Sequence, residues 1–245
     1  MRVALIGYGN MGKEVERLAR GRGIEIGPIF TSKNNSRAKG LTKDSLKGAD
    51  LCIDFSTPPA VLRNIEAVAR SGKNIVVGTT GWYGRMPSVR RIIRSCRTGL
   101  LYSPNFSIGM NMFMSIVAAA AGSLDVAGLY DAAIHEVHHR KKADSPSGSA
   151  LVLGRIILER VKAKKRIVTG VPRSPLRNDQ LLISSSRVGN VAGTHTVLLD
   201  SEADAIELTH RAKNRSGFAY GALRAAEWLK GKRGIFTMDD LLSSL

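Results

Sequence analysis

The first twenty residues limit the possible folds of this chain more than any other stretch. A short apolar run at residues 2–6 leads directly into the turn Gly7-Tyr8-Gly9-Asn10-Met11-Gly12, and a helical pattern then continues to Arg20. The spacing G-x-G-x-x-G between a strand and a helix predicts a dinucleotide-binding turn, because this context gives the motif its meaning. The glycines permit a tight turn and let a pyrophosphate approach the helix N-terminus. A tight turn without a ligand is the alternative interpretation.

Strand-like apolar runs alternate with helical patterns over the first half of the chain. The predicted strands are residues 2–6, 24–30, 49–55, 74–77 and 100–103. This alternation predicts a Rossmann-type, doubly wound parallel sheet, whose ligands bind beyond the carboxyl ends of the strands. Two further loops follow strands at that edge and are candidate cofactor-binding loops, although ordinary turn chemistry also explains each of them taken alone. Their residues are Gly78, Thr79 and Thr80, and Ser103, Pro104, Asn105 and Phe106.

The residues after the second predicted strand bear on the choice of cofactor. A site selective for NAD places an Asp or Glu there, where it binds the ribose hydroxyls. Here the sequence reads Thr31-Ser32-Lys33, with Arg37 and Lys39 beyond. Small hydroxyls and cations suit a 2′-phosphate, so we expect NADPH to be used at least as well as NADH, with Lys33 in the cofactor site.

A dense group of titratable residues lies near the middle of the chain. Residues 135–143 hold three histidines, a glutamate, an arginine and two lysines. Burying so many unpaired groups in a core would be costly, so the stretch is either an exposed basic loop or an active site. A predicted strand at 130–137 precedes it, and an amphipathic helix is predicted at 150–161. Between them, residues 144–149 supply a helix start whose N–H groups can bind a carboxylate.

The same stretch contains a literal match to a zinc-protease motif. Residues 135–139 read H-E-V-H-H, which fits H-E-x-x-H. That motif needs a helix to place its two outer histidines on one face. Because the preceding residues favour a strand, which would hold His135 and His139 far apart, we expect no metal site here.

Composition narrows the class of protein. The net charge is +17, but Lys and Arg are scattered in small clusters, and aromatic residues make up only 5%. This pattern favours anionic cofactors and substrates over nucleic acid, which stays a minor alternative. The chain shows no apolar run long enough to span a membrane and no signal-peptide pattern. Two cysteines make no disulfide framework. We therefore expect a cytoplasmic protein that binds neither membranes nor nucleic acid.

The last hundred residues differ in pattern from the first hundred. Strands are predicted at 181–188, 193–200 and 204–211, and a long helix at 216–230, with a short one at 238–244. Consecutive strands joined by short turns predict a mixed or antiparallel sheet in a second, α+β domain. The apolar face of such a sheet could also mediate self-association.

Several motifs together resemble the 4-hydroxy-tetrahydrodipicolinate reductase family, formerly called dihydrodipicolinate reductase. The family's signature resembles E-x-H-H-x-x-K-x-D-x-P-S-G-T-A, and residues 136–150 follow it closely. Further matching motifs, in chain order, are Gly7–Gly12, Asp54-Phe55-Ser56, Gly78-Thr79-Thr80-Gly81, Asn105-Phe106-Ser107 and Thr209-His210-Arg211-Ala212. The resemblance covers essentially the whole chain.

The resemblance implies that the chain forms two domains with different functions. Residues 1–107 and 216–245 would form the dinucleotide-binding domain, and residues 108–215 the substrate domain, which also builds a homotetramer. His138 matches the family's proton donor and acceptor, and Lys142 its proton donor. The matched substrate contacts are His139, Gly148, Ser149 and, more weakly, Arg215. Three departures stand out: Ser149 replaces a Thr, Lys141 replaces a common His, and no acidic residue follows the second strand.

The implied reaction uses NADPH, NADH or both to reduce a small dicarboxylate. In the family, 4-hydroxy-tetrahydrodipicolinate loses water and is reduced to tetrahydrodipicolinate, a step of lysine and diaminopimelate biosynthesis. Two other functions stay open from the residues alone. One is an NAD(P)-dependent amino-acid dehydrogenase, of the aspartate type, on a similar frame, and the other is a basic nucleic-acid-binding protein.

Overall fold

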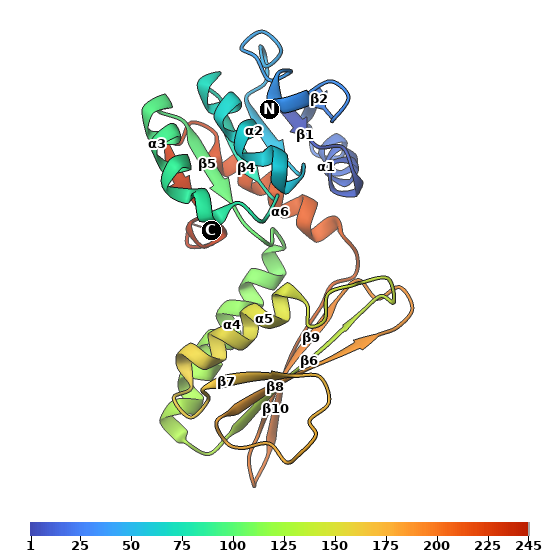
Figure 1. The fold of residues 1–245 in the computed structure, drawn as a ribbon, viewed down its shortest axis with the longest axis vertical. Coiled ribbons are helices and arrows are strands. Elements are labelled where there is room, and N and C mark those ends of the chain that lie inside the picture. The colour runs from blue at the N-terminus through green and yellow to red at the C-terminus, as the bar shows by residue number, and fades with distance from the viewer. Residues whose placement is uncertain (245) are drawn as a thin grey trace. The chain divides into compact units, whose positions relative to one another are not determined.

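The computed structural model describes residues 1–244, apart from the side chains of 124–127. The chain divides into two compact units (Figure 1). Unit 1 consists of Met1–Ile108 with Arg215–Leu245, and unit 2 is Gly109–Asn214. Arg215, which we expected at the end of the substrate domain, therefore belongs to unit 1.

Unit 1 contains a six-stranded sheet in which every neighbouring pair is parallel. In spatial order its strands are β11 (Gly234–Phe236), β5 (Gly99–Tyr102), β4 (Asn74–Val77), β3 (Leu51–Asp54), β1 (Arg2–Ile6) and β2 (Glu25–Phe30). From β2 the chain crosses over β1 to β3, and the strand order therefore reverses at β1, as in a doubly wound sheet. The predicted fold class is confirmed. The carboxyl ends of β1, β3 and β4 lie at one edge, where the glycine-rich turn follows β1.

Alternation along the central strands gives unit 1 two cores, one on each face of its sheet. Val3 and Leu5 of β1 pack on the face covered by α1 (Asn10–Arg20), α6 (Ser216–Leu229) and α7 (Met238–Leu242). Ala4 and Ile6 pack on the face covered by α2 (Pro58–Arg70) and α3 (Met86–Cys96). Two short 3₁₀ helices, η1 (Ser36–Ala38) and η2 (Tyr83–Arg85), lie in the connections. Helices on both faces explain why these strands read as continuous apolar runs.

Unit 2 contains a five-stranded mixed sheet, as predicted. In spatial order its strands are β10 (Ala205–Arg211), β9 (Thr194–Asp200), β6 (Asp131–His138), β8 (Gln180–Arg187) and β7 (Arg166–Thr169). The β6–β8 and β7–β8 pairs are parallel, and the β10–β9 and β9–β6 pairs are antiparallel. Residues from α4 (Ile108–Ala127) and α5 (Gly148–Arg160) pack with Ile134 of β6 and Ile183 of β8 in one core.

Burial alternates along β6, and this decides which of its polar residues face the helices. Ala132, Ile134, Glu136 and His138 are buried, whereas His135 is exposed. Since alternate side chains of a strand point to opposite faces, Glu136 and His138 lie on the same face as the core residue Ile134. Among residues 1–244, no helix combines the length and the hydrophobicity needed to cross a membrane.

Candidate active site

The glycine-rich turn of unit 1 has the geometry that a dinucleotide requires. Gly7 has φ +87°, and a Cβ there would lie 2.3 Å from the carbonyl oxygen of Phe55. A Cβ on Gly12 would lie 2.3 Å from the carbonyl oxygen of Gly7, so this third glycine lets helix α1 pack closely against the turn. A Cβ on Gly9 would meet nothing within 4 Å, which leaves open space at the helix start. These are the three roles that the fingerprint assigns to its glycines.

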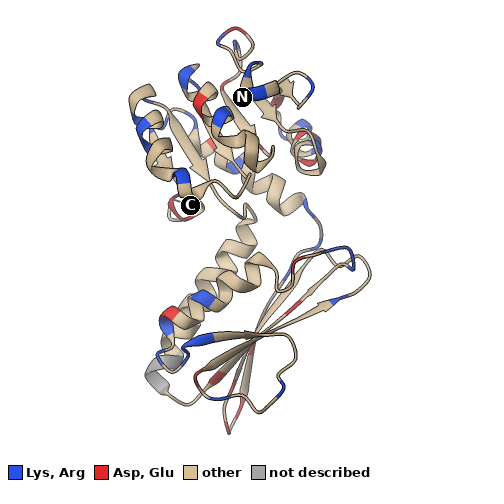
Figure 2. Cartoon of the chain, in the orientation of Figure 1, with Lys and Arg blue, Asp and Glu red and all other residues tan. Residues whose placement is uncertain are grey.

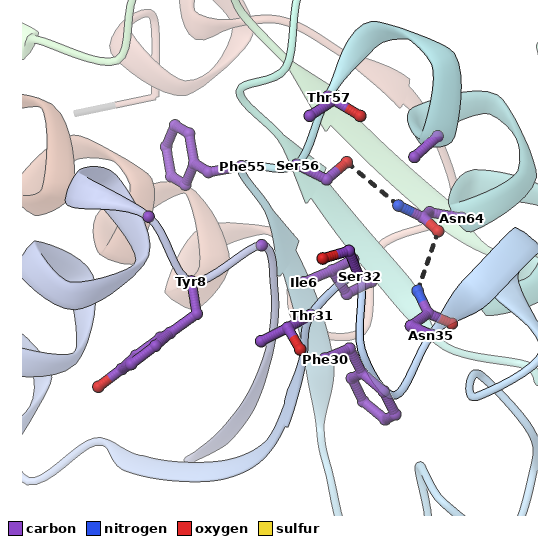
Figure 3. A pocket seen from close by; sticks show the side chains of 13 residues that line it. Ile6, Tyr8, Phe30, Thr31, Ser32, Asn35, Phe55, Ser56, Thr57 and Asn64 are labelled. Atoms are coloured by element: carbon purple, nitrogen blue, oxygen red, sulfur yellow. Dashed lines mark hydrogen bonds between the residues drawn. The ribbon is translucent and has the colours of Figure 1, made fainter.

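Two cavities adjoin this turn. One, of about 370 Å³, is lined by Gly7, Tyr8 and Gly9 together with polar residues that follow β2 and β3 (Figure 3). The other, of about 360 Å³, is lined by Gly9, Asn10, Met11, Gly78, Thr79 and Thr80. Both cavities are also lined by Phe55 and Ser56, so they adjoin each other at the carboxyl edge of the sheet. Their combined size and their loops fit an elongated dinucleotide, with the turn at its middle.

The buried carboxylate of Asp54, at the end of β3, holds two of these loops together. It accepts hydrogen bonds from the N–H and hydroxyl of Ser56 at 2.9 and 2.8 Å, and from the hydroxyl of Thr79 at 2.7 Å. Asn64 of α2 donates to its second oxygen at 2.9 Å and also contacts Asn35 (Figure 3). Burial raises the pKa of Asp54, and these donors oppose that rise. Asp54 therefore fixes the positions of residues that line both cavities.

The remaining residues predicted for the cofactor site line neither cavity. Lys33 is exposed just beyond Thr31 and Ser32, which do line the first cavity. The loop from Ser103 to Phe106 is held by its own hydrogen bonds, since the Ser103 hydroxyl donates to the carbonyl of Asn105 at 2.7 Å. Phe106 is buried and packs edge-on against Phe55, at a ring-centroid distance of 6.1 Å.

In unit 2, His138 lies at the end of β6 beside a fully buried carboxylate. Its Nδ1 atom is hydrogen bonded to Glu136, which has 0% exposure. The other oxygen of Glu136 accepts from Arg187 of β8 at 2.8 Å and from the N–H of Ser147 at 3.3 Å. Burial by itself would raise the pKa of Glu136, but the hydrogen bonds from Arg187 and His138 outweigh burial and lower it. Glu136 is therefore a carboxylate, and His138 donates its Nδ1 hydrogen to it.

Because Nδ1 is bonded to Glu136, the Nε2 atom of His138 is the ring nitrogen that could exchange a proton. Burial lowers the pKa of His138; Glu136 opposes this effect, and Lys142 and Arg187 add to it. Gly193, just before β9, lies against the same nitrogen: a Cβ there would come within 2.8 Å of Nε2. The absence of a side chain at position 193 keeps the Nε2 side of the imidazole free of that clash.

A second histidine, His195 of β9, packs against the first. The two ring centroids are 5.2 Å apart, and burial lowers the pKa of His195 to about 4. The Ser147 hydroxyl accepts from the N–H of Ala150 at 3.2 Å and lies 3.0 Å from Nε2 of His195. The Nδ1 atom of His195 is buried and has no hydrogen-bond partner among the described residues.

Glu136, His138 and His195 bring three potential metal-ligand atoms within 4.8 Å of one another. The Glu136 oxygens, however, already accept from His138, Arg187 and the main chain of Ser147. A cation there would also face the guanidinium of Arg187, so we interpret the group as a hydrogen-bonded network. The zinc motif does not apply, because β6 is a strand and the exposed His135 points to the other face, where it contacts Ser184 at 2.8 Å.

The other residues predicted to bind substrate lie around the end of β6 and the start of α5. Lys142 donates to both oxygens of Asp144, at 2.7 and 2.9 Å, and its side chain is partly exposed. Half-buried His139 directly follows β6. Gly148 and Ser149 are the first two residues of α5, which Ser147 caps. Arg215 is exposed at the residue before α6, in unit 1.

Sequence reasoning missed several residues of these sites. They are Asp54 and Asn64 in unit 1, and Glu136, Ser147, Arg187, Gly193 and His195 in unit 2. Glu136 could have been found from the sequence, because it lies two residues before His138 on a predicted strand and therefore on the same face of that strand. Ser147 lies in the predicted helix start at residues 144–149, whereas the remaining residues come from separate strands, loops and helices that only the tertiary structure brings together.

Comparisons with known proteins identify the family of this chain. Residues 1–106 match the family model for the N-terminus of dihydrodipicolinate reductase, and residues 109–242 match the model for its C-terminus. A 4-hydroxy-tetrahydrodipicolinate reductase from Christiangramia forsetii is 39% identical over 100% of this chain and 99% of its own length. The enzyme of that name from Archaeoglobus fulgidus is 38% identical over 99% of this chain and 100% of its own length.

A solved structure shares the fold. The dipicolinate-bound dihydrodipicolinate reductase from Paenisporosarcina sp. TG-14 aligns with a TM-score of 0.78 at 22% identity, over 97% of both chains. The match of both family models over nearly all of the sequence, together with the near-full-length relatives, leaves one conclusion: this chain belongs to the dihydrodipicolinate reductase family.

Proposed function

We propose that this chain reduces 4-hydroxy-tetrahydrodipicolinate to tetrahydrodipicolinate, with loss of water, in lysine and diaminopimelate biosynthesis. The reaction is the one named for its relatives, and a family structure was solved with dipicolinate, a planar dicarboxylate. The observation that carries the proposal is the pairing of His138 with the buried carboxylate of Glu136, directly beside the start of α5. This arrangement offers a proton next to a place for an anion.

The proton-transfer role of His138 follows from its hydrogen bonds. A bound nicotinamide cofactor supplies the hydride, and reduction of a conjugated imine leaves a carbon that needs a proton. Glu136 holds the imidazole with Nδ1–H toward itself, so the imidazolium carries its transferable proton on Nε2, beside Gly193. A histidine oriented by a carboxylate in this way is a well-placed general acid.

The substrate's two carboxylates need cationic or N–H partners. Gly148 and Ser149 begin α5, and the positive end of a helix dipole favours an anion there. Lys142 lies in the loop that leads to α5 and forms an ion pair with Asp144. A substrate carboxylate could replace Asp144 as the partner of Lys142. We propose that Lys142 also donates a proton during reduction and that His139 and Arg215 contact the substrate.

The lining of the first cavity supports the expected choice of cofactor. Thr31 and Ser32 line it and no Asp or Glu does, so no carboxylate there would repel a 2′-phosphate. Lys33 is exposed beside them and could pair with such a phosphate. We therefore propose that NADPH serves at least as well as NADH, with the glycine-rich turn and residues 78–80 and 103–106 holding the dinucleotide. A Michaelis constant much lower for NADH than for NADPH would contradict this.

We propose that unit 2 assembles the protein into a homotetramer in the cytoplasm. Unit 2 exposes apolar side chains on its strands, including Leu198 and Ile206, which are 37% and 43% exposed. Both cysteines are free thiols, as in a reducing compartment. Light scattering during size-exclusion chromatography measures the assembly, and a monomeric mass would contradict the tetramer.

The function is tested by oxidation of NADPH coupled to the synthase that produces the hydroxylated substrate. We expect consumption of NADPH only when both the synthase and this protein are present. Pyridine-2,6-dicarboxylate, the compound present in the related structure, should inhibit competitively with the substrate. Absence of coupled oxidation with either nicotinamide cofactor would overturn the proposal.

A further inference from the structure

A third cavity in unit 1 lies at the amino-terminal edge of its sheet, opposite the loops that follow β1, β3 and β4. It has a volume of about 440 Å³ and is lined by Arg90 and Arg94 of α3, Arg97 after it, and Arg233 before β11. Arg97 is two residues before β5 and Arg233 one residue before β11, so both lie where these strands begin. Ligands of parallel sheets bind at the other edge, and the cavity is therefore separate from the dinucleotide site.

The charge of this cavity is not balanced by the protein. Among the residues that the structure describes, its lining contains four arginines and no Asp or Glu. Figure 2 shows Lys and Arg but no acidic residue along α3, whose sequence is MPSVRRIIRSC. All four arginines are exposed, and none makes an ion pair within residues 1–244. Four like charges around one hollow repel one another until a counter-anion joins them.

The helix dipole explains only part of this arrangement. Cations near the C-terminus of a helix are favourable, which suits Arg94 and Arg97 at the end of α3. Arg90 lies a turn earlier, and Arg233 belongs to a different segment that precedes β11. Arg97 also adopts the left-handed conformation, with φ 52°, at a helix end where glycine is the ordinary residue. A guanidinium is thus held at the cavity in a backbone conformation that disfavours a side chain.

We propose that this cavity binds a small molecule with two linked phosphate groups, such as a nucleoside diphosphate. Guanidinium groups bind phosphate oxygens in pairs, and two phosphates carry nearly the charge that four arginines balance. A single carboxylate or phosphate would leave most of the positive charge unmatched. Ile93 and Ile235 also line the cavity and offer an apolar surface for the rest of the ligand. Thr98, 3% exposed, also lines the cavity, and its hydroxyl has no hydrogen-bond partner among the described residues.

Calorimetric titration of the full-length protein tests the proposal, with the heats fitted to the dinucleotide site and to a second, independent site. The probes are inorganic pyrophosphate and ADP at constant ionic strength. The test variant is R90Q/R94Q, which removes two cavity arginines. The matched control is R85Q/R91Q, which removes the same charge from exposed neighbours that do not line the cavity. All four positions are exposed, so both variants should fold, and thermal melting checks this.

We expect both probes to occupy a second site on the wild-type protein and to bind that site of R90Q/R94Q roughly tenfold or more weakly, because each lost contact is a charge-assisted hydrogen bond. R85Q/R91Q should stay within about twofold of the wild type, since exposed charges that do not contact the ligand are screened by salt. Equal weakening in both variants would show only attraction to a chain of net charge +17 and would overturn the proposal. Absence of a second saturable site on the wild-type protein would overturn it as well.

Discussion

His138 donates its Nδ1 hydrogen to Glu136, two residues earlier on the same face of β6. The carboxylate is itself held by Arg187 and by the main chain at the start of α5. The orientation of one imidazole thus depends on two neighbouring elements of unit 2. This relationship makes the site testable residue by residue.

Replacing Glu136 with Gln should lower turnover by roughly 10²- to 10⁴-fold, the range for losing a proton-transfer group or the carboxylate that orients it. The amide can also donate to Nδ1, which favours the wrong tautomer of His138. Steady-state kinetics with NADPH measures the effect, and the Michaelis constant for NADPH should stay near that of the wild type. His135→Ala, on the opposite face of the same strand, should leave turnover within a few fold. Full activity of folded E136Q would show that Glu136 does not position His138.

Replacing His138 or Lys142 with Ala should lower turnover by roughly a hundredfold or more, the usual scale for losing a general acid. Binding of NADPH should stay near normal, because the glycine-rich turn and both adjoining cavities belong to unit 1. Fluorescence titration of the cofactor separates binding from chemistry. Wild-type turnover in either variant would remove that residue from the mechanism.

Replacing Gly193 with Ala should both destabilise unit 2 and reduce turnover. The backbone there has φ +151°, and the new Cβ would lie 2.8 Å from Nε2 of His138. A strained backbone of this kind costs about 1–3 kcal/mol. Gly170→Ala is the matched control, since Gly170 has φ +82° but nothing within 4 Å of its Cβ position. Denaturant unfolding should show a loss of stability in both variants, and only G193A should lose turnover. Equal turnover in the two would rule out a steric role for position 193.

The pKa of His195 predicts an acid-sensitive fold. Burial lowers this pKa from the ordinary 6.5 to about 4, so the unfolded chain takes up a proton between those values and the folded chain does not. The contribution of His195 to the free energy of unfolding is therefore fully present above pH 6.5. It is lost as the pH drops toward 4, by up to about 3 kcal/mol. His195→Asn should lose less stability than the wild type between pH 7 and pH 4.5 in urea unfolding. The exposed variant His135→Asn should follow the wild type, and identical pH profiles for all three proteins would contradict the assignment.

Much of the fold could be predicted from the sequence because its signals are local. The run at residues 2–6 and the turn after it predicted β1, α1 and the parallel sheet. Two strands were not predicted. Strand β7 follows the charged stretch Lys162–Lys165, and β11 has only three residues, so neither presents the alternation that marks a strand.

The candidate site was predictable only where its residues are close in sequence. His138, Lys142 and Ser149 stand within one motif, whereas Arg187 and His195 join Glu136 and His138 through strand pairing in the unit 2 sheet. Pairing of His138 with Arg187 and of Glu136 with His195 is a property of register, which no local pattern encodes. The family resemblance correctly indicated the reductase, because both family models and the near-full-length relatives carry that name rather than that of an aspartate-type dehydrogenase.

Asp54 accepts from two residues that line the cavities beside the glycine-rich turn, through the Ser56 main chain and the Thr79 side chain. Because both donors must reach the same carboxyl group, the loop after β3 and the loop after β4 must each keep a length that allows this contact. An insertion before Ser56 or Thr79 would pull one donor away and leave a buried anion short of partners. We therefore expect that evolution lengthens other connections of this half of the molecule, and that these two keep their size.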